Sequence, residues 1–184
     1  IQMVSSGHLQ SNLDAAMRLL EQAAQAGAEL AVLPEFFGLM GFKDTDKLTV
    51  QEVFGRGPVQ QVLASAARSL GIWIVGGTVP ITTTTDPFRV HNTSLVFSPA
   101  GNCVARYDKI HLFWLRDGIE QFDESRVVQA GSTPAMFSLP SRDGHVWRVG
   151  LSVCYDLRFP ELYRVYARDG ADLLLVPSAF TYAT

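Results

Sequence analysis

The chain has 184 residues, of which 47% are hydrophobic and 18% charged, a balance typical of one ordinary domain (residues 1–184) with a continuous core. The formal net charge is -3 with both signs interspersed, so no basic stripe indicates nucleic acid and no polybasic run indicates an anionic membrane. The apolar runs are also too short to cross a membrane, and a small-molecule partner is predicted.

The first half of the chain predicts two amphipathic helices, each followed by a strand. Asn12 is a suitable N-cap for a helix over 12–26, and the short apolar run 29–33 is typical of a buried strand. A second helix over 58–70 has proline in its first turn and glycine after its end. A strand over 72–79 follows, and Gly76-Gly77 within it indicates a bulge or a close backbone approach.

The second half predicts two hairpins and a final helix–strand unit. Strands over 92–97 and 103–107 are joined by a turn-rich connector. Strands near 135–139 and 146–153 flank another turn, and a helix over about 160–169 precedes a strand over 172–176.

An internal repeat organises these elements. Residues 27–34 (GAELAVLP) recur as 170–177 (GADLLLVP), and an amphipathic helix precedes each copy. Helices that alternate with buried strands, with hairpins between them, predict an α/β domain with a mixed sheet or two sheets and helices on the outer faces. The ligand site should lie at the carboxyl ends of strands.

The two cysteines, Cys103 and Cys154, are too few for a disulfide framework, so a reducing cytoplasm is predicted. The chain begins with Ile1 and no signal peptide precedes the first helix, which indicates that the numbering starts inside a longer chain. The four histidines lack the paired spacing of a zinc site, so neither a metal nor a cofactor is predicted; His111 is read as a packing or hydrogen-bonding residue.

Three residues at predicted strand ends are candidates for chemistry. Cys154 lies between a strand and a helix, where backbone amides can lower a thiol pKa and receive an oxyanion; the alternative is a small buried apolar residue. Lys109 is either a recruited cation or a solvated loop charge. Glu35, next to Pro34 and two phenylalanines, is either a proton-transfer group with a raised pKa or a structural hydrogen-bonding residue.

The segments around these residues together resemble the three catalytic segments of the nitrilase superfamily, in order and in spacing. They are Leu33-Pro34-Glu35, the stretch 107–112 (YDKIHL) and the stretch 153–161 (VCYDLRFPE). The cysteine segment is highly specific, and the resemblance covers essentially the whole chain.

The resemblance implies Glu35 as general base, Lys109 as oxyanion stabiliser and Cys154 as the nucleophile that forms a thioester. The family has a second glutamate between its lysine and its cysteine, and Glu124 matches it, with a supporting role in orienting Lys109 or the substrate amine. The resemblance also implies a four-layer α-β-β-α sandwich. The family's domain continues beyond the point where this sequence ends, so the carboxyl-terminal part of the domain is expected to be missing.

The reaction implied is hydrolysis of a small amide without a cofactor, with the backbone amide of Tyr155 as a second oxyanion donor. The stretches 154–161 (CYDLRFPE) and 122–125 (FDES) look most like the small-amide branch, which includes omega-amidases and deaminated-glutathione amidases. Arg158 is the candidate for gripping a substrate carboxylate; a salt bridge to Asp156 or Glu161 is an equal alternative. Nitrile or N-carbamoyl-amine hydrolysis, a glutaminase domain of a larger synthetase and an inactive binding module remain alternative functions.

A homodimer is also expected, because it is usual in the family and because Tyr163 and Tyr166 would present apolar surface on the last helix. Cys103, in contrast to Cys154, is read as strand packing.

Overall fold

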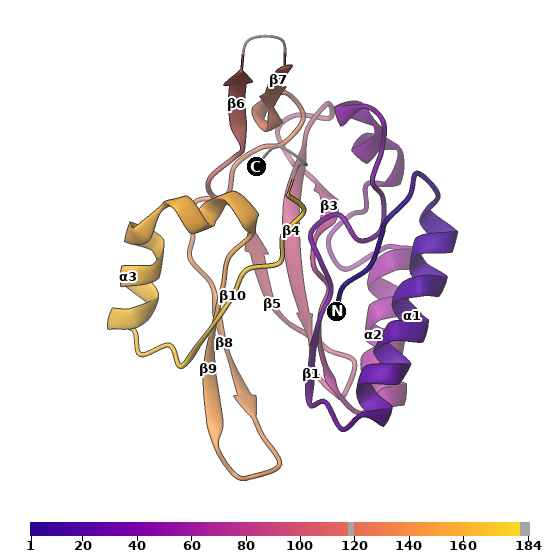
Figure 1. Ribbon diagram of the computed structural model, residues 1–184, viewed down its shortest axis with the longest axis vertical. Helices are drawn as coiled ribbons and strands as arrows, with labels where there is room; N and C mark the ends of the chain where they lie inside the picture. The colour runs from indigo at the N-terminus through magenta and orange to yellow at the C-terminus, as the bar shows by residue number, and fades with distance from the viewer. Residues whose placement is uncertain (118–119, 181–184) are drawn as a thin grey trace.

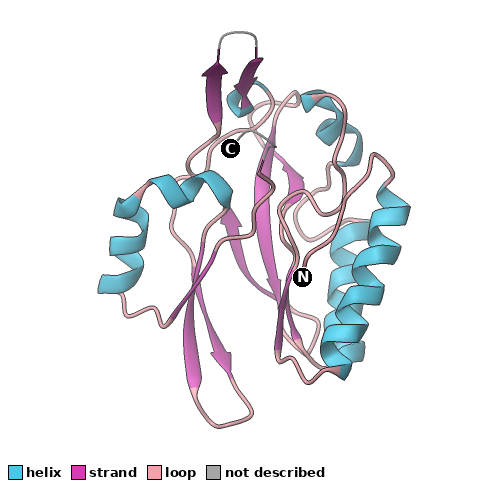
Figure 2. Cartoon of the chain, viewed as in Figure 1, coloured by secondary structure: helices cyan, strands magenta, loops and turns pink. Residues whose placement is uncertain are grey.

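The structure, a computed structural model, describes residues 1–117 and 120–180 and has four layers. Two helices cover one outer face, two sheets lie against each other in the middle, and a third helix covers the other outer face (Figures 1 and 2). The α-β-β-α sandwich that the resemblance implies is therefore confirmed.

The helical elements agree closely with the periodicity of the sequence. They are α1 (Leu9–Gln25), α2 (Pro58–Leu70), α3 (Pro160–Arg168) and the short 3-10 helices η1 (Asp44–Val50), η2 (Glu124–Arg126) and η3 (Cys154–Arg158). The prediction of Asn12 as N-cap was wrong, since α1 begins one turn earlier, with His8 in the cap position. The buried Asn12 side chain instead binds the backbone of Ser6 and the carbonyl of Gly38.

The strands form two main sheets and one small hairpin. The first sheet has the order β1-β2-β4-β3, with β5 also paired to β4: β1 (Leu30–Val32), β2 (Trp73–Val75), β3 (Val79–Thr82), β4 (Val90–Phe97) and β5 (Cys103–Asp108). The second sheet has the order β10-β9-β8: β8 (Met136–Pro140), β9 (Val146–Leu151) and β10 (Leu173–Leu175). The hairpin, which the sequence did not predict, joins β6 (Trp114–Asp117) to β7 (Glu120–Asp123).

The internal repeat corresponds to two equivalent units, one in each sheet. α1 leads into β1, which pairs parallel with β2, and α3 leads into β10, which pairs parallel with β9. One apolar core lies between α1, α2 and the first sheet, and a second lies between the two sheets and beneath α3. The segments that follow the two copies emerge on the same side of the molecule (Figure 1).

The predicted strand over 72–79 is split into β2 and β3 at Gly76-Gly77. Gly77 has φ +46°, and a Cβ there would lie 1.9 Å from the carbonyl oxygen of Pro34. Only glycine permits this approach, so the expectation of close backbone contact is confirmed. The contact fixes the chain at the point where β1 ends and Glu35 follows.

Two readings of side chains were wrong. Tyr166 is 1% exposed, because its ring packs inward against the second core and its hydroxyl donates to the carbonyl of Leu151, so it presents no outer apolar surface. Cys103 is exposed, since it begins β5 at an irregularity in the pairing with β4.

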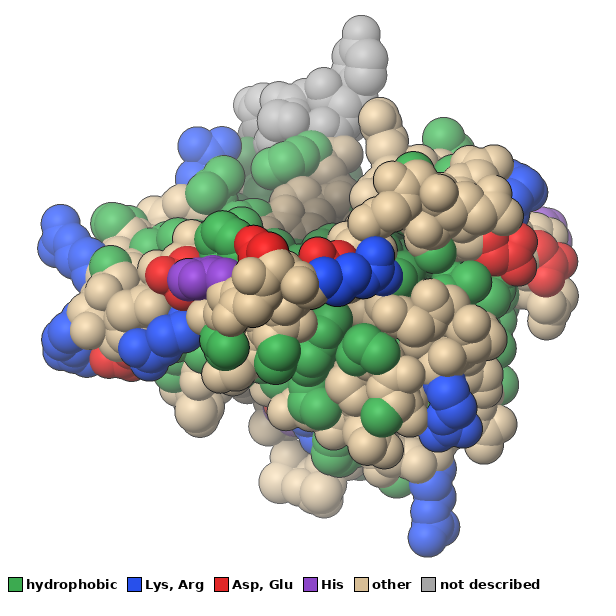
Figure 3. Space-filling model, turned by 90° about the horizontal axis from the view of Figure 1, so that it is seen from below, with side chains coloured by type: hydrophobic (Ala, Val, Ile, Leu, Met, Phe, Trp, Pro, Cys, Tyr) green, Lys and Arg blue, Asp and Glu red, His purple; other side chains and the backbone are tan. Residues whose placement is uncertain are grey.

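The surface agrees with the dispersed charge of the sequence. On the face drawn in Figure 3, Lys and Arg side chains are scattered over the edge and the interior of the face, and no continuous basic stripe is seen among the described residues. None of the helices within 1–117 and 120–180 has both the length and the apolar character of a membrane span.

Candidate active site

A cavity of about 440 Å³ opens beside the ends of the strands and collects the predicted residues from four separate segments. Its lining includes Glu35, Lys109, Glu124 and Cys154. Aromatic and aliphatic side chains form much of the remaining wall, among them Phe36, Leu39, Phe113, Trp114 and Tyr155. The structure therefore brings together four polar residues that are up to 119 positions apart (154 − 35 = 119).

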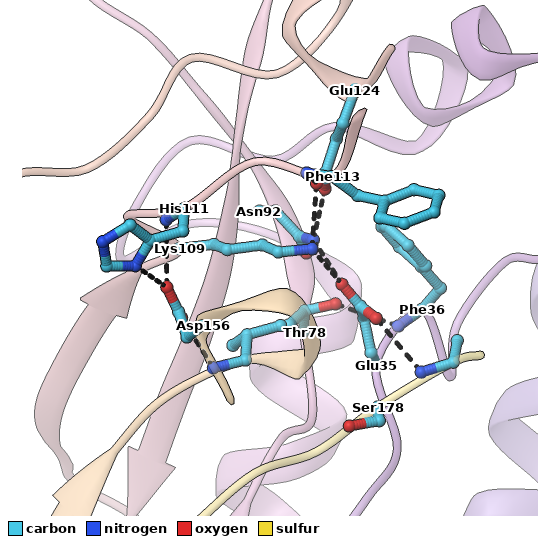
Figure 4. Close-up of polar contacts among 12 residues, drawn as sticks. Glu35, Phe36, Thr78, Asn92, Lys109, His111, Phe113, Glu124, Asp156 and Ser178 are labelled. Carbon is cyan, nitrogen blue, oxygen red and sulfur yellow. Dashed lines mark hydrogen bonds and ion pairs between the residues drawn. The ribbon is translucent and has the colours of Figure 1, made fainter. Parts of the chain in front are cut away.

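Lys109 lies at the centre of the buried polar cluster (Figure 4). Its ammonium nitrogen is 2.9 Å from Oε1 of Glu35 and 2.9 Å from Oε2 of Glu124, and the Lys109 side chain is only 2% exposed. Burial alone would lower the pKa of Lys109, but the two carboxylates outweigh burial and hold that pKa above its usual range. The two carboxylates therefore favour the protonated, positively charged form of Lys109.

Two contacts place Glu35, one made by the backbone of the next residue and one made by the Glu35 carboxylate. Its backbone continues into Phe36, whose φ is +55° and whose amide donates to the hydroxyl of Thr78. Its Oε2 atom accepts from the amide of Ala179, just after β10. Burial raises the pKa of the Glu35 carboxyl, and the nearby Lys109 cation limits that rise. Such a carboxylate is well suited to proton transfer near neutral pH.

Cys154 begins η3, three positions beyond the end of β9 at Leu151 and not at the strand end as predicted. It has φ +47°, an uncommon conformation for a non-glycine residue, and its amide donates to the carbonyl of Pro177. Among the described residues, the positive φ values outside glycine are those of Phe36 and Cys154. Unusual backbone geometry therefore occurs at Cys154 and at Phe36, the residue next to Glu35.

The expectation that backbone amides would lower the pKa of Cys154 was wrong. Burial raises the pKa of the thiol to about 11, and the negative charge of Glu35 adds to the rise, outweighing the opposing effects of Lys109 and the Ala179 backbone. The resting thiol is thus neutral at neutral pH. A reaction at sulfur needs a neighbouring base, and Glu35 is the carboxylate that interacts with it.

Asp156 holds the turn that carries Cys154. Its fully buried carboxylate accepts from the amide of Val153 at 2.8 Å, from the Tyr107 hydroxyl at 2.7 Å and from both the amide and Nδ1 of His111. His111 also stacks on Phe159 at 3.7 Å, so its reading as a packing and hydrogen-bonding residue is confirmed. These bonds tie the turn that carries Cys154 to the segment that follows Lys109.

Arg158 is exposed and lines the cavity. The expected alternative, a salt bridge to Asp156 or Glu161, does not form among the described residues, because the Asp156 carboxylate is buried and already accepts four hydrogen bonds. Tyr155 also lines the cavity, and its backbone amide follows Cys154 directly in the chain.

Sequence reasoning missed Asn92, a buried residue near the start of β4. Its side-chain nitrogen donates to Oε1 of Glu35 at 2.9 Å and to Oε1 of Glu124 at 3.0 Å. No sequence signal singled it out, because Asn92 is one of four consecutive polar residues, 91–94, in β4. Within residues 1–117 and 120–180, no three His, Cys, Asp or Glu side chains are grouped so that they could hold a metal ion.

Comparison with known proteins identifies one family. Residues 1–183 match the carbon-nitrogen hydrolase family model. The chain is 36% identical to a deaminated glutathione amidase of Synechocystis, with all of this chain and 66% of that protein aligned. It is 36% identical to omega-amidase NIT2 of Danio rerio, with 94% of this chain and 59% of that protein aligned. The chain therefore spans about two thirds or less of the length of these relatives.

Solved structures give the same result for the fold. The NitFhit protein of C. elegans superimposes with a TM-score of 0.85 at 32% identity, over 99% of this chain and 43% of that chain. Nit3 of Saccharomyces cerevisiae, a member of the nitrilase superfamily, gives 0.82 at 28% identity, over 100% and 64%. An amidase mutant from Nesterenkonia sp. AN1, with acrylamide added at its active-site cysteine, gives 0.76 at 25% identity, over 97% and 65%.

Proposed function

Because this chain belongs to the carbon-nitrogen hydrolase family of the nitrilase superfamily, we propose that the full-length protein hydrolyses a small amide through a thioester on Cys154. The observation that carries the proposal is the buried Lys109–Glu35 ion pair beside a neutral cysteine in one cavity. It supplies a base, a cation and a nucleophile in one enclosed volume.

In the proposed first step, Glu35 takes the thiol proton as sulfur bonds to the amide carbon, and the carbonyl electron pair moves to oxygen. The Lys109 ammonium and the Tyr155 amide stabilise that oxyanion. When the carbon–nitrogen bond breaks, Glu35 returns the proton to the leaving ammonia or amine. Water then gives a proton to Glu35 and attacks the thioester carbon. The carbon–sulfur bond breaks, the carboxylic acid is released, and Glu35 returns its proton to sulfur, which restores the thiol.

The relatives support the small-amide branch as the substrate class. Those named above are a deaminated glutathione amidase and an omega-amidase, and the Nesterenkonia amidase carries its acrylamide adduct on a cysteine. Glu124 has the supporting role in this proposal, because its Oε2 binds Lys109 and also accepts from the amide of Phe113. That second bond fixes the carboxylate, so Lys109 is held from two sides.

The intact mass of the full-length protein, measured after mixing with a panel of small amides, tests the proposal. We expect an added mass equal to the acyl group of the substrate, together with release of ammonia. A different outcome would place the protein in another branch of the superfamily. In that outcome, amides give no acyl adduct and no ammonia, whereas nitriles or N-carbamoyl amines are hydrolysed.

Arg158 is proposed to bind a carboxylate that lies away from the scissile amide. It is exposed at the cavity and has no ion pair among the described residues, so its guanidinium is available for a bidentate contact. Arg158→Lys keeps the charge but loses the planar fork, and we expect KM for dicarboxylic monoamides to rise about tenfold, equivalent to ~1.4 kcal/mol. KM for neutral amides serves as the control. Equal losses on both substrate types would mean that Arg158 only maintains the loop.

We also propose that the full-length protein is a cytoplasmic homodimer. Closed two-fold dimers are the commonest soluble oligomers, and exposed apolar side chains on the second sheet, including Trp147, Leu173 and Leu174, offer surface for association. Sedimentation that finds only monomer at micromolar concentration contradicts the dimer.

A further inference from the structure

Two donors and two acceptors form a closed ring in the candidate site. Lys109 and Asn92 each donate to both Glu35 and Glu124, with donor–acceptor distances of 2.9 to 3.0 Å (Figure 4). We propose that Asn92 is a positioning residue that fixes which oxygen of Glu35 receives the thiol proton. This inference rests on the proposed function, in which Glu35 is the base for Cys154.

The hydrogen bonds of Glu35 distinguish its two oxygens. Oε1 accepts from both Lys109 and Asn92, so its lone pairs are occupied. Oε2 accepts only from the Ala179 amide, at 3.1 Å, among the described residues, and keeps a lone pair. Glu35 and Cys154 line the same cavity, and Oε2, with its remaining lone pair, is the oxygen that we assign to take the thiol proton.

Lys109 alone cannot impose this arrangement, because an ammonium group rotates freely about its terminal bond and accommodates many carboxylate orientations. The amide group of Asn92 is planar, and its two hydrogens point in fixed directions, one to each carboxylate. The main chain anchors both donors, because the Lys109 amide donates to the Asn92 carbonyl at 3.0 Å between adjacent strands. Glu35 and Glu124 are therefore held at a fixed separation and rotation.

Asn92 acts through these carboxylates and not on the substrate. It is 2% exposed, is absent from the cavity lining, and uses both side-chain hydrogens within the ring. Its loss should therefore change the rate of proton transfer and leave substrate binding intact.

The test compares Asn92→Ala with the full-length protein. We expect kcat to fall tenfold or more with little change in KM, since a misoriented base slows the chemical step. The acidic limb of the rate profile should move to higher pH. The charged and titratable groups around Glu35 are Lys109, Glu124 and Cys154, and loss of a donor to the Glu35 carboxylate favours the protonated form of Glu35. Asn92→Asp, which keeps the shape but adds a third carboxyl, should lose more activity.

Gln60 provides a matched control. It is also a buried side-chain amide that donates twice, to the carboxylate of Glu52 at 3.0 Å and to the carbonyl of Val53 at 2.9 Å, away from the cavity lining. Gln60→Ala should destabilise the protein while kcat and the pH profile stay unchanged. The inference is overturned if Asn92→Ala has the kcat of the wild type and an unshifted pH profile. It is also overturned if the fall in kcat is no larger than the fall in Gln60→Ala.

Alkylation of Cys154 by iodoacetamide gives the same comparison without a substrate. We expect slower alkylation of Cys154 at neutral pH in Asn92→Ala, because a misoriented Glu35 no longer assists ionisation of the thiol. If the alanine variant does not fold, Asn92→Asp takes its place with the same expected result. Equal alkylation rates in wild type and variant contradict the role of Asn92. If the wild type hydrolyses no amide, the proposed function fails, whereas the alkylation rates still decide whether Asn92 positions Glu35.

Discussion

Replacement of Cys154 by alanine should reduce amide hydrolysis by the full-length protein at least about 10⁴-fold, because removal of a nucleophile eliminates the covalent route and leaves only oxyanion binding. The variant should fold, since Cys154 is a small buried side chain and alanine leaves little empty space. Initial rates with the best amide from the panel, and the intact mass of the mixture, measure both effects. No acyl adduct should form.

Cys103→Ala is the matched control for this experiment. Cys103 is exposed at the start of β5 and lies outside the cavity lining, so its removal should leave both turnover and acyl adduct in place. Retention of activity without Cys154, or inactivation by iodoacetamide with label on Cys103 alone, shows that the nucleophile is assigned wrongly.

Lys109→Met should produce the second large effect, which combines lost stability and lost activity. Without the cation, the carboxylates of Glu35 and Glu124 are left buried beside each other, and breaking a buried ion pair in this way costs about 3–5 kcal/mol. Glu35 then protonates more readily, because Lys109 no longer lowers its pKa, so the base is lost as well as the oxyanion donor. We expect kcat to fall about 10²–10³-fold or more, with urea unfolding as the measure of stability.

Lys47→Met is the control for the expected loss in the free energy of unfolding. Lys47 also borders the cavity, but its contact with Asp44 is 3.8 Å long and the partner carboxylate is half-exposed, so its removal should change the free energy of unfolding by less than about 1 kcal/mol. A Lys109→Met protein as stable as Lys47→Met would mean that the contacts of Lys109 with Glu35 and Glu124 do not stabilise the fold.

The local pattern of the sequence predicted the elements that depend on neighbours in the chain. The helix over 58–70 has its predicted bounds because proline at its first position and glycine after its end act within one turn. The repeat of 27–34 at 170–177 predicted equivalent helix–strand units, and Gly76-Gly77 predicted a close backbone approach, each from residue types alone. The motifs around Glu35, Lys109 and Cys154 resembled a family that the comparisons then identified.

Only the tertiary structure decided how distant residues combine. The sequence named Glu35, Lys109 and Glu124, but not the ring that Asn92 closes, because Asn92 reaches the glutamates across 57 and 32 positions of chain. It predicted a lowered pKa for Cys154 from the turn, whereas burial and the Glu35 charge raise it, and both depend on packing. Spacing and propensity act within a few residues, whereas desolvation, charge pairing and shared hydrogen bonds arise only when strand ends from different sheets meet.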